Sequence, residues 1–234
     1  MTITTSPSIN PGDIIAVGDI HGRLDLLDLF LDRVRDSGAT VILLGDMIDR
    51  GPNDLGVLNR VAPLLDDPES WGLSGFYALR GNHEKMFMDA CDGYGVLLWV
   101  QNGGCLQDIE EMEPHLEWVS KLPIYMVVGD TMFVHAGVSP GHDPAKKIAE
   151  KKADDLVWMR QPFLKLGPML GKWTDKIKRV VHGHTPLFEE GERGQPDISK
   201  KEDRIGIDCG AYFTGTLGSY NATQNTLFFD TINA

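Results

Sequence analysis

The amino-acid sequence predicts an α/β fold, and two observations carry that prediction. Before residue 90, three short apolar runs are each followed by a glycine-containing loop and then by apolar residues at helical spacing. Strands that alternate with helices in this way are typical of a parallel sheet. After residue 120, closely spaced strand pairs appear, which fits a second sheet packed on the first.

The elements of the first half follow from the spacing of the apolar residues. The predicted strands cover residues 14–17, 41–44 and 76–79. The predicted helices cover residues 24–34, residues 55–65 and a segment that begins at residue 83 or 84. Because ligands of parallel α/β sheets gather outside the carboxyl ends of the strands, the loops after these strands are the expected place for a functional site.

The second half is predicted to be helical at first and rich in hairpins afterwards. Residues 94–121 read as mostly helical with a break at 102–104, and residues 139–178 as irregular structure with short helices. Gly129 and Asp130 form a two-residue turn between two apolar runs, which predicts a hairpin. The predicted strands of this half cover residues 124–128, 131–134, 179–181, 204–208, 218–222 and 226–230, the last two joined as a hairpin around 223–225.

Length and composition indicate one folded domain. The chain has 234 residues, 42% of them hydrophobic, which is enough to bury a core without disulfide or metal staples. We expect a flexible tail over residues 1–10 and a single domain over residues 11–234. The three cysteines, Cys91, Cys105 and Cys209, are too few and too scattered to indicate a disulfide framework or a zinc site.

Charge and hydropathy argue against two classes of partner. The formal net charge is −12, whereas general binding to nucleic acid needs a basic surface. The longest apolar runs are far shorter than the roughly 20 residues that cross a bilayer, and no targeting segment is visible. We therefore expect a cytoplasmic protein that binds neither nucleic acid nor membranes.

Histidines gather in the loops that follow the predicted strands. Of the seven histidines, five lie there: His21, His83, His135, His182 and His184. The same loops carry further polar ligands, namely Asp19, Asp46, Asp49 and Asn82. Imidazole, carboxylate and amide groups together suit manganese, iron or zinc rather than calcium or copper. The set is large enough to hold two ions.

Several of these loops resemble the signature blocks of a known enzyme family. The blocks read Gly18-Asp19-Ile20-His21-Gly22, Gly45-Asp46-Met47-Ile48-Asp49-Arg50-Gly51 and Arg80-Gly81-Asn82-His83-Glu84, followed by His135-Ala136-Gly137 and Gly183-His184. In this order they resemble the phosphoprotein phosphatases of the calcineurin-like metallophosphoesterases, most closely the bacterial and phage members. The resemblance runs from about residue 14 to the C-terminus. It implies a four-layer αββα sandwich, which some schemes class as α+β.

The resemblance implies a role for each residue of the site. It implies six metal ligands. Asp19 and His21 would bind one ion, Asn82, His135 and His184 would bind the other, and Asp46 would bind both. It further makes Arg50 and Arg160 the side chains that bind phosphate oxygens. His83 would be the general acid for the leaving alcohol, oriented by Asp49.

The implied activity is that of a metal-dependent phosphoprotein phosphatase with two divalent ions, for which manganese is preferred and iron or zinc stays open. A metal-bridging hydroxide would attack phosphoserine or phosphothreonine directly, with phosphotyrosine as a further substrate. Bis(nucleosyl) tetraphosphate hydrolases and small-molecule phosphatases share the motifs and stay open as alternatives. A protein that only regulates would have damaged motifs, and none of the assigned residues is replaced. We expect a monomer or weak oligomer whose partner is a phosphorylated protein or another anionic phosphoester.

Three features each leave two interpretations open. His182 is expected beside the metal ligands rather than among them. Cys209 follows a strand and lies either near the metal ions or, as we expect, as a packed thiol. Residues 140–180 carry ten basic and five acidic side chains, which form either a solvated surface or a basic flap that steers anionic substrates.

Overall fold

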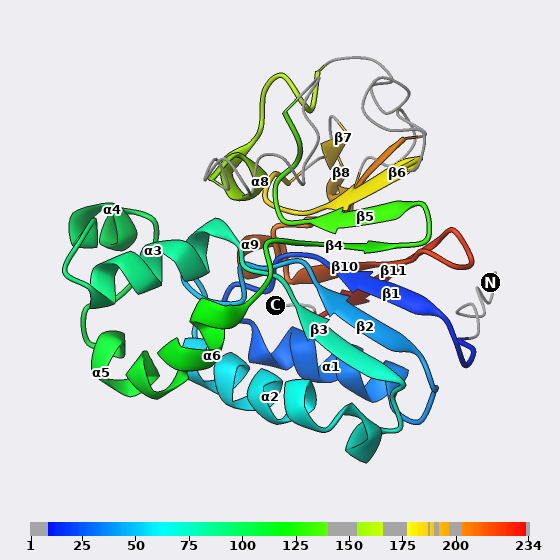
Figure 1. Ribbon diagram of the computed structural model, residues 1–234, viewed down its shortest axis with the longest axis horizontal. Coiled ribbons are helices and arrows are strands. Elements are labelled where there is room, and N and C mark those ends of the chain that lie inside the picture. The colour runs from blue at the N-terminus through cyan, green and yellow to red at the C-terminus, as the bar shows by residue number, and fades with distance from the viewer. Residues whose placement is uncertain are drawn as a thin grey trace.

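Two β-sheets stacked face to face form the centre of the molecule in the computed structural model (Figure 1). The structure describes residues 9–139, 154–165, 177–186, 188–189, 192–196 and 203–232. Helices α1 (Leu24–Val34) and α2 (Asp54–Asp66) cover the outer face of the first sheet. Helix α8 (Asp154–Trp158) packs on the outer face of the second sheet, so the layers follow the order αββα.

The first sheet has five strands in the order β11-β10-β1-β2-β3. Strands β1 (Ile14–Val17), β2 (Thr40–Leu43) and β3 (Gly75–Ala78) run parallel, as the sequence predicts. The hairpin of β10 (Thr216–Asn221) and β11 (Thr226–Thr231) comes from the end of the chain and pairs antiparallel with β1. Its place beside β1 is a long-range feature that no local pattern indicates.

The second sheet has four strands in the order β4-β5-β6-β9. Strands β4 (Tyr125–Val128) and β5 (Thr131–Val134) form the predicted hairpin. Strands β5, β6 (Arg179–His182) and β9 (Arg204–Gly206) run parallel to one another, which the sequence analysis did not anticipate. Their carboxyl ends therefore open on one side, as those of the first sheet do. A separate ribbon pairs β7 (Phe188–Glu189) with β8 (Glu192–Pro196).

Short helices connect the strands: α3 to α6 lie between β3 and β4 along the chain, and one more, α9, follows the second sheet. Helix α3 begins at Asn82, within the third block of the sequence, and α9 connects β9 to β10 along the chain. These elements are α3 (Asn82–Cys91), α4 (Val96–Gln101), α5 (Asp108–Met112), α6 (Leu116–Lys121) and α9 (Ala211–Thr214), with 3-10 turns at Pro68–Trp71 and Glu113–His115.

Successive residues of the central strands enter different hydrophobic layers. In β1, Ile15 and Val17 face α1 and α2, whereas Ala16 faces the second sheet. In β5, Phe133 faces the first sheet, whereas its neighbours Met132 and Val134 pack beneath α8. Side chains alternate along a strand, so a sheet buried on both faces needs apolar residues at every position. This explains why the strands read as continuous apolar runs in the sequence.

The predicted strands and the first helices end within two residues of the observed ones. The long helical prediction over 94–121 is broken into three short helices and a 3-10 turn. Residues 1–8 of the predicted tail lie outside the described residues, while Ile9, also assigned to that tail, packs against the core. Among the helices that the structure describes, none has the length and apolar character needed to cross a membrane.

Candidate metal centre

Five loops at the carboxyl ends of the strands bring the predicted site residues together. The loop after β1 supplies Asp19 and His21, the loop after β2 supplies Asp46, Asp49 and Arg50, and residues after β3, β5 and β6 supply Asn82, His83, His135 and His184. The eight residues other than Arg50 are at most 5% exposed. Polar groups so deeply buried need partners, which makes their mutual contacts informative.

The backbone is strained where these side chains are presented. In the described part of the chain, seven residues other than glycine have a positive φ, and five of them are predicted site residues: His21, Asp46, Asp49, Arg50 and His184. Side chains rarely adopt this conformation, and it is found where function requires an unusual direction. The strain thus marks the same residues as the sequence motifs do.

Two glycines allow the loops to approach one another closely. A Cβ at Gly81 would collide with the carboxylate of Asp46, and a Cβ at Gly183 would collide with that of Asp19. The φ of Gly81 is −91°, which any residue adopts, so the collision alone excludes a side chain there. The glycines of these blocks are needed for space beside the carboxylates.

One group of potential ligands contains His21, Asp46 and His83. The His21 Nδ1 donates to the carbonyl oxygen of Ile48 at 2.9 Å, which leaves the Nε2 lone pair directed into the site, 3.8 Å from Asp46 Oδ2. Burial lowers the pKa of His21 to about 3, so the imidazole is in the neutral form that binds a metal ion. Asp19 Oδ2 lies 4.0 Å from the same Nε2.

A second group contains Asp46, His135 and His184. The His135 Nδ1 donates to the carbonyl oxygen of Leu44 at 3.0 Å. Its Nε2 then lies 2.9 Å from Asn82 Oδ1, 3.3 Å from Asp46 Oδ2 and 3.2 Å from His184 Nδ1. Asn82 Oδ1 and Asp46 Oδ2 are acceptor atoms, so a proton on His135 Nε2 or a cation is needed among them. Asp46 belongs to both groups, as a bridging carboxylate would.

Buried carboxylates crowd around the two groups. Burial, with repulsion from Asp208 and Asp46, raises the pKa of Asp19 well above its usual value. Burial likewise raises the pKa of Asp208 to about 6, although the Gly210 N–H donates to its Oδ1 at 2.8 Å. Divalent cations would relieve this repulsion, and the mixed oxygen and nitrogen donors suit them. The residues therefore fit a pair of divalent metal ions.

The side chain of His83 is held at one nitrogen only. Its Nδ1 bonds to Asp49 Oδ2 at 2.6 Å. Its Nε2 is buried without a hydrogen-bond partner among the described residues and lies 3.8 Å from Asp46 Oδ2. The Nε1–H of Trp99 donates to both oxygens of Asp49, at 3.0 and 2.9 Å. His83 and Asp49 are expected from the sequence motifs, whereas Trp99 lies outside those motifs.

The two arginines reach the two groups from different elements. Arg50 Nη1 donates to His21 Nε2 at 2.6 Å, and Arg160 Nε donates to His184 Nε2 at 3.1 Å. Both arginines are exposed, so their guanidinium groups can reach a ligand from solvent. Guanidinium groups in these places can bind the oxygens of a phosphate.

Glu84 holds two of the loops together. Its carboxylate accepts hydrogen bonds from the backbone N–H groups of Asp46, Met47 and Gly81, at 2.9, 2.7 and 2.8 Å. The side chain is fully buried. Glu84 belongs to the third block, but its role could not be expected from the sequence, because contacts to backbone groups 37 and 38 residues away leave no local pattern.

The structure also shows where His182, Cys209 and part of the basic segment 140–180 lie, for each of which the sequence left two interpretations open. The ring of His182 packs edge-on against Phe163, 5.1 Å between centroids, and lies outside both ligand groups. Cys209 is buried and its Sγ donates to the carbonyl oxygen of Ile207, so it is a packed thiol. Within the basic segment, Lys178 pairs with Asp130 at 3.3 Å. Most of that segment lies outside the described residues. Six of its ten basic residues lie there, namely Lys146, Lys147, Lys151, Lys152, Lys172 and Lys176.

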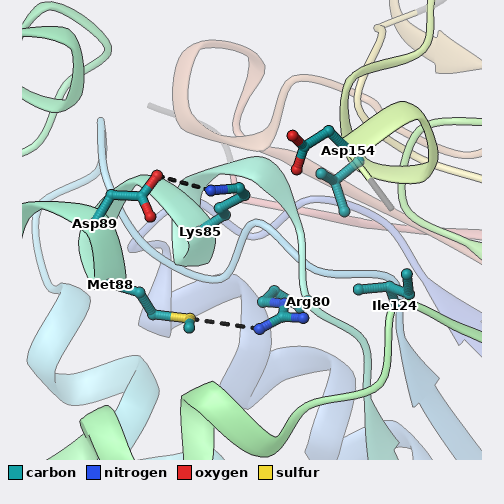
Figure 2. Close-up of a pocket in the computed structure, with 7 residues that line it drawn as sticks. Arg80, Lys85, Met88, Asp89, Ile124 and Asp154 are labelled. Carbon is teal, nitrogen blue, oxygen red and sulfur yellow. Dashed lines mark hydrogen bonds and ion pairs between the residues drawn. The ribbon is translucent and has the colours of Figure 1, made fainter. Parts of the chain in front are cut away.

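A separate pocket of about 110 Å³ lies beside α3 and contains none of the predicted site residues (Figure 2). The Nη1 of Arg80 donates there to Met88 Sδ, and Lys85 pairs with Asp89 at 2.8 Å. Arg80 begins the third signature block, yet it faces this pocket and the carbonyl oxygen of Ser120 instead of the metal ligands.

Comparison with known proteins shows which proteins this chain is similar to. The family model described as Calcineurin-like phosphoesterase matches residues 12–210. The serine/threonine-protein phosphatase 2 of Escherichia coli is 37% identical over 232 residues, which covers 88% of this chain and 91% of that protein. The symmetrical bis(5'-nucleosyl)-tetraphosphatase of Acidovorax ebreus is 28% identical over 209 residues, 81% of this chain and 70% of that protein.

A solved structure shows the same fold. The structure of a protein serine/threonine phosphatase from Saccharomyces cerevisiae matches with a TM-score of 0.61 and 18% identity. The match covers 95% of this chain and 81% of that one. The four-layer arrangement is therefore shared well beyond the range of close sequence similarity.

Proposed function

Since the chain belongs to the calcineurin-like phosphoesterase family, we propose that it is a metal-dependent phosphoprotein phosphatase acting on phosphoserine and phosphothreonine. One observation carries the proposal: His83 is fixed through Nδ1 by Asp49, while its unpartnered Nε2 lies beside the carboxylate common to both ligand groups. That is the arrangement of a general acid aimed at a phosphoester held over the two groups.

Two divalent ions would be held by the six residues Asp19, His21, Asp46, Asn82, His135 and His184. When bound, they supply charge neutralisation of the phosphate and a water of lowered pKa. We propose manganese as the resident ion, with iron and zinc as the alternatives, because the donor set combines imidazole nitrogens with carboxylate and amide oxygens.

The chain's own residues bind the phosphate and move the proton. Arg50 and Arg160 each offer forked N–H donors that match phosphate oxygens. The Nε2–H of protonated His83 would pass its proton to the oxygen of the departing alcohol. The carboxylate of Asp49 accepts from Nδ1–H throughout, which keeps the ring in one orientation and stabilises its charged form.

A second candidate function is the hydrolysis of bis(nucleosyl) tetraphosphates. The relative from Acidovorax ebreus carries that name, and its similarity covers most of both chains. The residues that bind metal ions and phosphate can serve either reaction, so the choice depends on what lies outside them.

A substrate panel on chelator-stripped protein tests the proposal. The protein is reloaded with manganese, iron or zinc and assayed with phosphoserine and phosphothreonine peptides, a diadenosine tetraphosphate and p-nitrophenyl phosphate. We expect metal-dependent release of phosphate from the peptides. Faster cleavage of the tetraphosphate, with inert peptides, would make the second candidate the correct one.

Variants of the shared carboxylate, Asp46, and of the proposed acid, His83, test the roles of these two residues. Asp46→Asn and His83→Asn should lose hydrolysis of the phosphopeptides by roughly a hundredfold or more. His115→Asn is the matched control, because His115 is half-buried next to Trp118 and distant in sequence from every ligand loop. Retained activity in Asp46→Asn or His83→Asn would refute the role of that residue.

A further inference from the structure

Two exposed aromatic side chains border the candidate metal centre, one beside each ligand group. The Tyr212 ring stands edge-on to His21, with 5.5 Å between centroids and 84° between planes. The Trp158 ring stands edge-on to His184, at 6.2 Å and 86°. Tyr212 is 40% exposed and Trp158 is 38% exposed, so each ring keeps surface that a ligand can touch.

Each ring accompanies one of the two arginines. The guanidinium carbon of Arg50 lies 5.4 Å from the centroid of the Tyr212 ring, while its Nη1 contacts His21. Arg160 follows Trp158 by two residues and contacts the same His184 against which Trp158 stands. Histidine, arginine and aromatic ring therefore occur together twice, on elements that are distant in the sequence.

Tyr212 lies on a short helix, and Trp158 lies on another. Helix α9, which carries Tyr212, is bounded by Gly210 and Gly215, both with positive φ. Helix α8 is anchored by the buried Leu156, whose carbonyl oxygen accepts from Ala136 N–H at 2.9 Å, next to His135. Partly exposed rings that lie against histidines of a polar centre can contact a ligand bound there.

We propose that Tyr212 and Trp158 are specificity-determining residues that receive an aromatic ring attached directly to the substrate phosphate, as in phosphotyrosine. The inference rests on the proposed function, because it takes phosphate to be bound between the two arginines. In an aryl phosphate a single oxygen separates the ring from the phosphorus, so the ring lies next to the phosphate-binding groups. In a nucleotide the ribose intervenes and carries the base farther out.

Phosphonates that differ only in the ring provide a test without turnover. Dissociation constants of phenylphosphonate and methylphosphonate are measured by calorimetry on the manganese-loaded protein and on the variants Tyr212→Leu and Trp158→Leu. We expect each variant to weaken phenylphosphonate by roughly three- to tenfold and to leave methylphosphonate unchanged. Tyr212→Phe and Trp158→Phe keep a ring and should bind phenylphosphonate as the parent does.

A turnover assay complements the binding test. Phosphotyrosine and phosphoserine peptides of the same sequence are compared, and the ratio of their kcat/KM values should fall by the same three- to tenfold in the leucine variants. Tyr94→Leu is the matched control, because Tyr94 is a 74% exposed tyrosine at the α3–α4 connection. Thermal unfolding of every variant separates loss of fold from loss of the ring.

The outcomes are distinct. Equal weakening of phenylphosphonate and methylphosphonate, or no weakening of either, would overturn the inference. If the parent hydrolyses p-nitrophenyl phosphate but no phosphopeptide, the proposed protein substrate is wrong, and the phosphonate binding still decides the role of Tyr212 and Trp158.

Discussion

The indole Nε1–H of Trp99 donates to both carboxylate oxygens of Asp49, the residue that holds the proposed acid His83. Trp99 lies in α4 and is fully buried, with its ring 5.9 Å from that of Phe87. The pair joins two segments 50 residues apart. The position of His83 therefore depends on a helix that contributes no metal ligand.

Replacing Trp99 by phenylalanine should lower kcat more than it changes KM. A hydrogen bond to a charged acceptor contributes about 1.5–3 kcal/mol, so we expect kcat for a phosphopeptide to fall roughly tenfold or more. Trp118→Phe is the control, because the Trp118 Nε1–H bonds to His115 and not to the site. An unchanged kcat in Trp99→Phe, with the fold intact, would show that Asp49 needs no second partner.

The collision at Gly81 predicts a specific loss of metal binding. In Gly81→Ala the new methyl group meets the Asp46 carboxylate, although the backbone itself accepts alanine. We expect manganese affinity, measured by titration of chelator-stripped protein, to fall roughly tenfold or more. Gly75→Ala is the control, because its φ is not positive and its Cβ would meet only the side chains of Tyr77 and Thr40, at 3.0 Å or more. Equal affinities in the two variants would contradict the close packing of the loops.

Asp54 predicts a pH-dependent change in stability. It is the first residue of α2, is 8% exposed, and its Oδ1 has no hydrogen-bond partner in the described part of the chain. Burial, with repulsion from Asp49 and Asp108 adding to it, raises the pKa of Asp54 from 3.8 to about 7. Between these values the folded state binds more protons than the unfolded state, so this carboxyl lowers the free energy of unfolding as pH rises.

Asp54→Asn should therefore stabilise the protein at pH 8 by about 2 kcal/mol, with a much smaller gain at pH 5. Urea unfolding at the two pH values measures the difference. Asp66→Asn, at the exposed far end of the same helix, is the control. A gain that is the same at both pH values would mean that Asp54 is ionised throughout.

Much of the fold could be predicted because local patterns carry it. The strands buried on both faces read as continuous apolar runs, and the site residues follow directly at their carboxyl ends. The pairing of β10 with β1 was not predictable, since it joins segments about two hundred residues apart without a turn between them. The parallel alignment of β5, β6 and β9 was missed for the same reason.

The residues of the site could be predicted from the sequence, but the hydrogen bonds that hold them in place could not. The blocks contain Asp46 and His83, which the structure places 3.8 Å apart. Trp99 and Glu84 act through long-range hydrogen bonds, and a buried tryptophan in a helix reads in the sequence as core alone. The positive φ of five site residues could not be predicted either, because only glycine adopts that backbone conformation freely.

Metal stoichiometry tests whether the site holds two ions that share Asp46. Chelator-stripped protein and its Asp46→Asn variant are titrated with manganese, and bound metal is measured by elemental analysis alongside hydrolysis of p-nitrophenyl phosphate. The account predicts about two ions per chain with activity that follows occupancy, and loss of tight binding in Asp46→Asn, because that carboxylate serves both groups. Full activity with one ion or none, or two ions retained in Asp46→Asn, would contradict it.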